Sequence, residues 1–160
     1  DQIFQTLYVL NTAYQKTRVI SGSQFKLIRV PESRLFGLEK MKIRGSEITV
    51  SDRERTLVDL FYFSDPVGGL RQVFEIFKSQ VKSRKANAKK LVKYALRFPS
   101  ISTRKRIGYA LEKGGVPDRV LRPLLKSVAK TSLWPLYGPG KSRAGMINQK
   151  WKLIIDDARK

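Results

Sequence analysis

The sequence predicts an α+β fold, in which a mainly antiparallel N-terminal sheet is packed by about five helices. Up to residue 51, short runs of β-branched and aromatic residues are separated by turn residues such as Ser21-Gly22-Ser23. After residue 51, apolar residues recur at three- and four-residue spacings, which is typical of helices. The change falls within residues 47–63, where a strand runs directly into a helix.

The N-terminal third contains five short extended segments. We expect strands over residues 3–10, 18–21, 24–30, 36–43 and 47–51. Pro31 and Gly45 interrupt the pattern between neighbouring segments. Because the connections are short, these strands should pair mainly antiparallel.

Five helical segments follow. Their expected ranges are residues 52–63, 67–83, 87–98 and 102–113, and Pro117 opens the fifth. Ser51 and Glu54 have the spacing of a capping box for the first helix. Pro123 predicts a kink or break in the fifth helix.

The chain after Lys130 changes character again. We expect an extended stretch over residues 134–137, a loop over residues 138–145 and a final strand over residues 151–155 that can rejoin the sheet. No internal repeat or composition shift marks a boundary, so residues 1–160 are predicted to form a single domain. Its parts are the sheet (residues 1–51), the helices (52–130) and the C-terminal loop and strand (131–156).

The composition indicates a polyanionic partner. The chain has 33 Lys and Arg against 13 Asp and Glu, which gives a net charge of +20, and such a protein is attracted to nucleic acid. No apolar run reaches the length of a membrane span, so we expect no membrane partner. The absence of cysteine excludes disulfides and favours a cytoplasmic protein.

The positive charge is concentrated between Ile76 and Leu111, where no Asp or Glu occurs. Like charges at helical spacing repel, so an acid-free run indicates that a partner supplies the negative charge. Duplex phosphates can do so without any base-reading pattern. The alternative is an ordinary solvated face. We expect phosphate contacts from nine side chains: Lys82, Lys85, Lys89, Lys90, Lys93, Arg97, Arg104, Lys105 and Arg106.

Catalysis has little support in the sequence. The chain has no His and no Cys, so the commonest acid–base and nucleophile arrangements are absent. The carboxylates are not clustered, and no Glu-x-Lys pattern of a metal-dependent nuclease occurs. The GPGKS motif over residues 138–142 lacks the first glycine of a phosphate-binding loop, because Pro135 stands there. We expect no catalytic residue, no metal and no cofactor.

Four residues at the strand–helix junction are expected to have structural roles. Ser51 and Glu54 would cap the first helix. Arg55 and Asp59 lie one helical turn apart and can pair, and a buried pair there would fix geometry more than it adds stability.

The same junction resembles a known family. Val50-Ser51 followed by Arg55-Thr56-Leu57-Val58-Asp59 is similar to the strand and R-T-L-x-D segment of AbiEi-type antitoxins. Gly68-Gly69 resembles the start of that family's second helix, and residues 105–112 resemble its basic R-L-G-Y-L-L-E helix. The strand at Trp151 is similar to the family's closing strand, so the resemblance covers about residues 6–155.

The resemblance implies the antitoxin of a bacterial type IV, abortive-infection toxin–antitoxin system that serves in phage defence. The partner would be a nucleotidyltransferase-like toxin. A full member has an N-terminal winged-helix DNA-binding domain and a C-terminal domain that carries antitoxicity. It represses its own promoter, and basic surface on the C-terminal domain assists DNA contact. Asp1 is not a start methionine and nothing before it could form a winged helix, so we expect only the C-terminal domain.

We therefore expect a non-enzymatic antitoxin and transcriptional regulator that neutralises its toxin and supports promoter DNA binding. Two alternatives are a general nucleic-acid-binding module unrelated to toxins and a metal-dependent nuclease. A third is that the basic face binds an acidic toxin instead of DNA.

Overall fold

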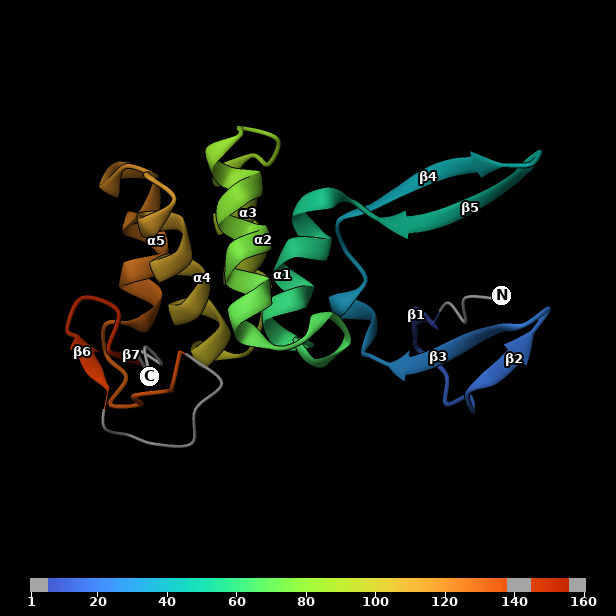
Figure 1. Cartoon of the computed structure of the whole chain (residues 1–160), viewed down its shortest axis with the longest axis horizontal. Coiled ribbons are helices and arrows are strands. Elements are labelled where there is room, and N and C mark those ends of the chain that lie inside the picture. The colour runs from blue at the N-terminus through green and yellow to red at the C-terminus, as the bar shows by residue number, and fades with distance from the viewer. Residues whose placement is uncertain (1–5, 138–144, 156–160) are drawn as a thin grey trace.

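Two β units stand at one end of the molecule, a helical bundle forms its middle, and a small hairpin lies at the other end (Figure 1). The computed structural model describes residues 6–137 and 145–155. These residues confirm the predicted α+β class, with five α-helices and mostly antiparallel strands in small sheets.

The first β unit is a three-stranded sheet in the order β1-β3-β2. Its strands are β1 (Thr6–Asn11), β2 (Arg18–Ile20) and β3 (Ser23–Arg29). β2 and β3 form an antiparallel hairpin, but β1 runs parallel to β3, with Leu10 opposite Ile28. This pairing corrects the expected antiparallel meander, because the chain crosses over between β1 and β2 and places β1 on the far side of β3.

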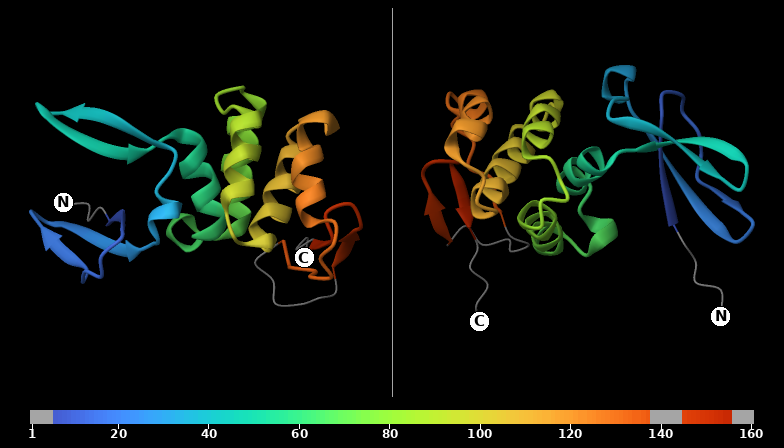
Figure 2. Two further views of the ribbon diagram at one scale, coloured as in Figure 1. Left: turned by 180° about the vertical axis from the view of Figure 1, so that it is seen from behind. Right: turned by 90° about the horizontal axis from the view of Figure 1, so that it is seen from above.

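The second β unit is a hairpin of β4 (Leu38–Ile43) and β5 (Ser46–Ser51). Arg44 and Gly45 both have positive φ, 49° and 81°, which suits a two-residue turn between twisted strands. Every residue of β4 is exposed. The prediction of one sheet packed by the helices is therefore wrong: the two β units are separate and extend away from the bundle, as Figure 2 shows from above.

The helices match the predicted ranges to within three residues. They are α1 (Arg53–Tyr62), α2 (Leu70–Lys82), α3 (Ala88–Arg97), α4 (Ile101–Lys113) and α5 (Asp118–Val128), with short 3₁₀ turns η1 (Glu32–Arg34) and η2 (Asp65–Val67). α4 contacts each of the other four helices. Its Ile107 and Leu111 are fully buried beside Phe77 of α2, Leu91 of α3 and Leu121 of α5. The period-3.6 apolar pattern therefore produces one shared core. None of the helices in the described ranges has the length and apolar content needed to cross a bilayer.

Pro123 does not break α5, although its position predicts a kink. The carbonyl that loses its helical partner belongs to Arg119, in the first turn of the helix. Pro123 and Arg119 are both exposed, so water can satisfy that carbonyl.

The C-terminal hairpin packs on the opposite end of the bundle from the β units (Figure 1). It pairs β6 (Met146–Asn148) with β7 (Leu153–Ile155), and Leu136 adds a parallel bridge to Ile154. The predicted return of residues 151–155 to the N-terminal sheet is therefore wrong. The GPGKS motif lies outside the described residues.

Candidate polyanion-binding surface

α1 begins one residue later than the capping-box prediction requires. Its N-cap is Asp52, whose carboxylate accepts the backbone N–H of Arg55 at 2.8 Å. The Ser51 hydroxyl instead lies 2.8 Å from the hydroxyl of Thr56. Asp52 is a sufficient cap by itself, so the predicted Ser51–Glu54 box is wrong.

Glu54 and Asp52 instead tie α1 to α3. The Glu54 carboxylate accepts the N–H of Asn87 at 2.8 Å, and the Tyr94 hydroxyl donates to Asp52 at 2.8 Å. The Lys90 ammonium lies 3.2 Å from Asp52 and 3.1 Å from Glu54. Because both carboxylates already neutralise Lys90, it is not a free cation, which corrects its assignment as a phosphate contact.

The same contacts set the pKa values of these groups. Burial raises the pKa of Asp52, but hydrogen bonds from the Arg55 backbone, Tyr94 and Lys90 outweigh burial and leave the pKa lowered. Glu54 behaves alike: hydrogen bonds from the Asn87 backbone and Lys90 overcome burial and lower its pKa. The pKa of Lys90 is raised, mainly by the hydrogen bond to Glu54 and then by that to Asp52.

Arg55 forms the predicted pair with Asp59, with 2.8 Å between Nε and Oδ2. Its Nη1 also donates to the carbonyls of Arg34 and Phe36, and its guanidinium lies 4.3 Å from the centroid of the Phe36 ring. Arg55 is 1% exposed. Burial raises the pKa of Asp59, against the opposing effect of Arg55. The pair therefore anchors the segment before β4 to the bundle, which is a structural role.

The three consecutive basic residues of α4 all donate hydrogen bonds to backbone carbonyls. Lys105 is fully buried and donates to the carbonyl of Leu133, and burial lowers its pKa. Arg106 donates twice to the carbonyl of Leu136, at 3.0 and 2.8 Å, and Arg104 donates to the carbonyl of Phe98 at 2.8 Å. The prediction that Lys105 contacts phosphate is therefore wrong, because its side chain is buried. Arg104 and Arg106 are half-buried, and each uses at least one guanidinium N–H in a hydrogen bond to a backbone carbonyl.

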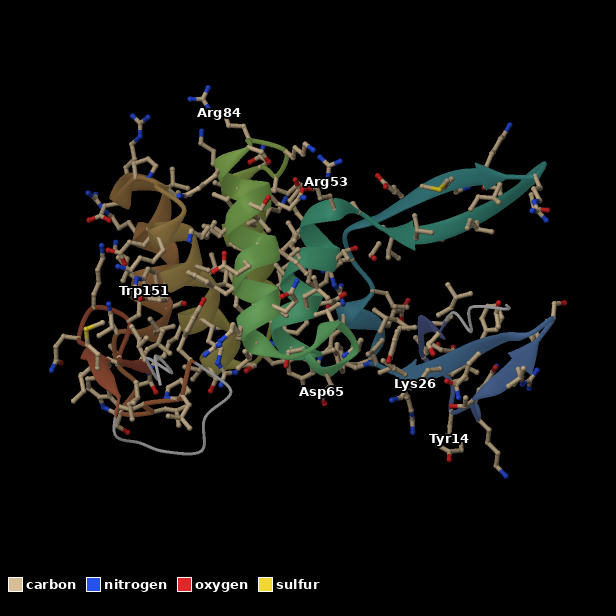
Figure 3. All side chains as sticks on the ribbon, in the orientation of Figure 1. Tyr14, Lys26, Arg53, Asp65, Arg84 and Trp151 are labelled. Carbon is tan, nitrogen blue, oxygen red and sulfur yellow. The ribbon has the colours of Figure 1, made fainter. Side chains whose placement is uncertain are left out.

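The remaining predicted cations form an exposed surface. Arg97 is exposed, and its guanidinium lies 3.9 Å from the Phe36 ring centroid. Lys82, Lys85, Lys89 and Lys93 are exposed, and among the described residues none has an ion pair. Arg84 belongs with them at the α2–α3 turn, where Figure 3 shows it projecting from the end of the bundle. We call Lys82, Arg84, Lys85, Lys89 and Lys93 the basic surface.

α5 adds three cations that the sequence analysis did not select: Arg119, Arg122 and Lys126, all exposed. They are separated from α3 by more than 20 residues, but α5 packs against α3. The signal that could have found them is their three- and four-residue spacing, opposite the apolar stripe of α5.

A groove of about 770 Å³ lies between α3 and α5. Its lining residues are Lys89, Val92, Lys93 and Leu96 from α3, with Arg119, Val120 and Pro123 from α5. The cations therefore flank apolar side chains. Within the described residues, no group of three or more metal-ligating side chains lies together.

Gly108 and Glu112 of α4, which lie within the motif at residues 105–112, have a packing role. A Cβ at Gly108 would lie 2.1 Å from the indole ring of Trp151. The indole N–H of Trp151 donates to Glu112, and Lys150 bridges Glu112 and Asp118 at 2.9 and 2.8 Å. Gly108 and Glu112 thus hold the C-terminal hairpin on the bundle.

No protein-family model matches the sequence, and a search of curated proteins finds no relative. Among solved structures, the chain is similar to the crystal structure of the RV2827C protein from Mycobacterium tuberculosis, with a TM-score of 0.57 and 16% sequence identity. The match covers 98% of this chain and 57% of that chain, so this chain spans little more than half of that protein's length. At this identity, the likeness shows a shared fold.

Proposed function

We propose that this chain is the C-terminal regulatory domain of an AbiEi-like antitoxin, whose basic surface contacts the phosphate backbone of promoter DNA. The observation that carries the proposal is the basic surface itself, five exposed cations without an ion pair among the described residues. A net charge of +20 adds long-range attraction to the same partner. This role is one of binding, without catalysis.

The spacing of the basic surface suits a phosphate backbone. Lys85, Lys89 and Lys93 follow one another at four-residue intervals, and the latter two lie on successive turns of α3. The basic surface contains no aromatic side chain on which the bases of a single strand could stack, so a duplex is the better partner. Contacts of this kind fix position on a duplex and leave sequence recognition to other residues.

The antitoxin part of the proposal is supported by the resemblance at the strand–helix junction and in α4. On that reading, the chain is cytoplasmic and neutralises a nucleotidyltransferase-like toxin. The fold carries both of these motifs as packing residues, Arg55 with Asp59 and Gly108 with Glu112. The motifs therefore support a fold similar to that of the antitoxin family. The binding role depends instead on the exposed cations.

The DNA contact is tested by charge reversal on α3. The double variant Lys89→Glu, Lys93→Glu should bind a promoter duplex at least about tenfold more weakly at low salt, because two phosphate contacts become repulsive. The slope of log K against log salt concentration should fall by about 2. Electrophoretic or anisotropy titrations over several salt concentrations measure both quantities.

The matched control is Lys16→Glu, Lys42→Glu, which changes the net charge equally at two exposed residues of the N-terminal region. Its affinity should fall much less. If both double variants retain equal affinity, the basic surface does not contact phosphate. The antitoxin role has a separate readout: co-expression of the chain should relieve growth arrest by the toxin of its operon. Salt-dependent duplex binding without such relief would favour a general nucleic-acid-binding module.

A further inference from the structure

The groove between α3 and α5 combines two chemistries that a phosphate backbone does not need together. Lys89, Lys93 and Arg119 supply positive charge, and among the described residues none of the three has an ion pair. Leu96 and Val120 line the same groove, and both are only half-buried. Half-buried apolar side chains in a groove that also carries unpaired cations favour an occupant that is itself both apolar and acidic.

The length of the groove limits the occupant. Its α3 wall extends from Lys89 to Leu96, which at 1.5 Å per residue is about 10 Å, or two helical turns. A helix laid in it would present apolar residues at i, i+3 or i+4, and i+7, with acidic residues beside them. The acidic residues of such a helix would face the cations, and its apolar residues would cover Leu96 and Val120.

A second copy of this chain is a poor candidate for the occupant. Within the described α-helices of this chain, every carboxylate already has a partner. Glu54 accepts from the Asn87 backbone, Asp59 pairs with Arg55 and Glu75 with Lys78, and Glu112 and Asp118 both pair with Lys150, so no unpaired acidic face is left. Two copies would also bring together chains of net charge +20.

We propose that the α3–α5 groove docks an acidic, amphipathic helix of a partner protein. Identifying that partner with the toxin rests on the proposed function, whereas the groove's preference for apolar and acidic side chains does not. Because Lys89 and Lys93 belong to both the groove and the basic surface, the helix and a duplex compete for them. Docking of the partner would thereby release DNA.

The probe is a designed, fluorescein-labelled helical peptide of about 15 residues, with Leu at i, i+3, i+4 and i+7 and Glu on both flanks. One control peptide replaces Leu with Gln and keeps the charge. The other replaces Glu with Gln and keeps the apolar stripe. Anisotropy titrations at about 0.15 M NaCl should show binding of the first peptide at least about tenfold tighter than of either control.

Variants of the protein distinguish the contribution of the groove to binding from that of the rest of the basic surface. Lys93→Glu with Arg119→Glu should weaken peptide binding about tenfold or more, because the rim then repels the acidic flanks. Val120→Thr, which is nearly isosteric, and Leu96→Gln should weaken it severalfold, because they make the floor polar. Arg84→Glu with Lys85→Glu lies outside the groove and should leave peptide affinity unchanged while weakening duplex binding.

The outcomes separate the two proposals. If the Gln-for-Leu peptide binds as well as the probe, or if both floor variants bind it normally, the attraction is electrostatic only and the groove proposal is overturned. If Val120→Thr weakens duplex and peptide binding equally, the groove serves nucleic acid, which also overturns it. If no duplex binds, but the peptide probe binds and the Val120→Thr and Leu96→Gln variants weaken that binding, the DNA function fails and the groove proposal stands. Circular dichroism of each variant confirms that it is folded.

Discussion

Gly108 is the residue that lets α4 and the C-terminal hairpin come into contact. The Trp151 ring lies where any side chain at position 108 would begin, and it is fully buried there. Glycine in the middle of a helix normally costs about 1 kcal/mol relative to alanine. Here the cost is offset by burial of the indole ring, one of the largest side chains in the core.

We therefore predict that Gly108→Ala destabilises the protein by about 3 kcal/mol, although alanine is the better helix former. The reason is the 2.1 Å separation between the new Cβ and the Trp151 ring, which forces the hairpin away from α4. Urea unfolding measures the change. Adding Trp151→Phe should recover part of the loss, since the smaller ring makes room. A stabilised Gly108→Ala variant would show that the helix and hairpin are not in this contact.

Lys105 shows what sequence reasoning misses at the scale of one residue. It belongs to an acid-free basic run, yet it is buried because the chain after α5 passes over it and offers the carbonyl of Leu133. Nothing near position 105 in the sequence specifies that contact, which joins residues 28 apart. Lys90 is similar, since its two carboxylate partners come from the start of α1.

At the scale of elements, helices were predictable and strand pairing was not. Apolar periodicity is local, so it located all five helices to within three residues. Pairing depends on residues far apart in the chain, so the parallel β1–β3 pair and the β6–β7 hairpin were missed. The candidate site divides in the same way. The α3 cations were found from their spacing, whereas the α5 side of the groove depends on helix packing.

The start of α1 is also where the elements are joined by charge, and this gives a pH prediction. The pKa values of Asp52 and Glu54 are lowered in the folded protein from ordinary values of 3.8 and 4.5. Their contribution to stability is therefore present above about pH 4.5 and is lost as the pH falls through the folded-state pKa values. Asp59, whose pKa is raised, acts in the opposite direction.

Asp52→Asn should keep the helix cap, since asparagine also caps well, but lose the ion pair with Lys90. We expect a loss of about 1 kcal/mol at pH 7 and a smaller further loss between pH 5 and pH 3 than in the unmodified protein. Urea unfolding at several pH values measures this. Glu39→Gln, at an exposed carboxylate of β4, is the control and should leave the profile unchanged. An unaltered pH profile for Asp52→Asn would contradict the depressed pKa.

For the whole molecule, the excess of positive charge lowers the stability of the fold, although the same charge favours binding of a polyanion. Compacting a chain of net charge +20 brings like charges together, and the basic surface gathers five of them without an ion pair among the described residues. Surface pairs such as Lys40–Glu47 contribute only about 0.5 kcal/mol each in the other direction. Repulsion should therefore be the larger of the two salt-sensitive effects.

We predict that the free energy of unfolding rises by about 1–2 kcal/mol when NaCl is increased from about 0.05 to 0.5 M, because the Debye length shortens from about 14 to 4 Å. Unfolding should be followed in urea, which is uncharged and adds no ionic strength. Lys89→Glu with Lys93→Glu should show a smaller rise than Lys16→Glu with Lys42→Glu, although both lower the net charge by four. Equal rises would mean that total charge alone sets the repulsion. A stability that falls with salt would mean that the paired carboxylates of α1, and not the unpaired cations of α3, dominate the electrostatics of the fold.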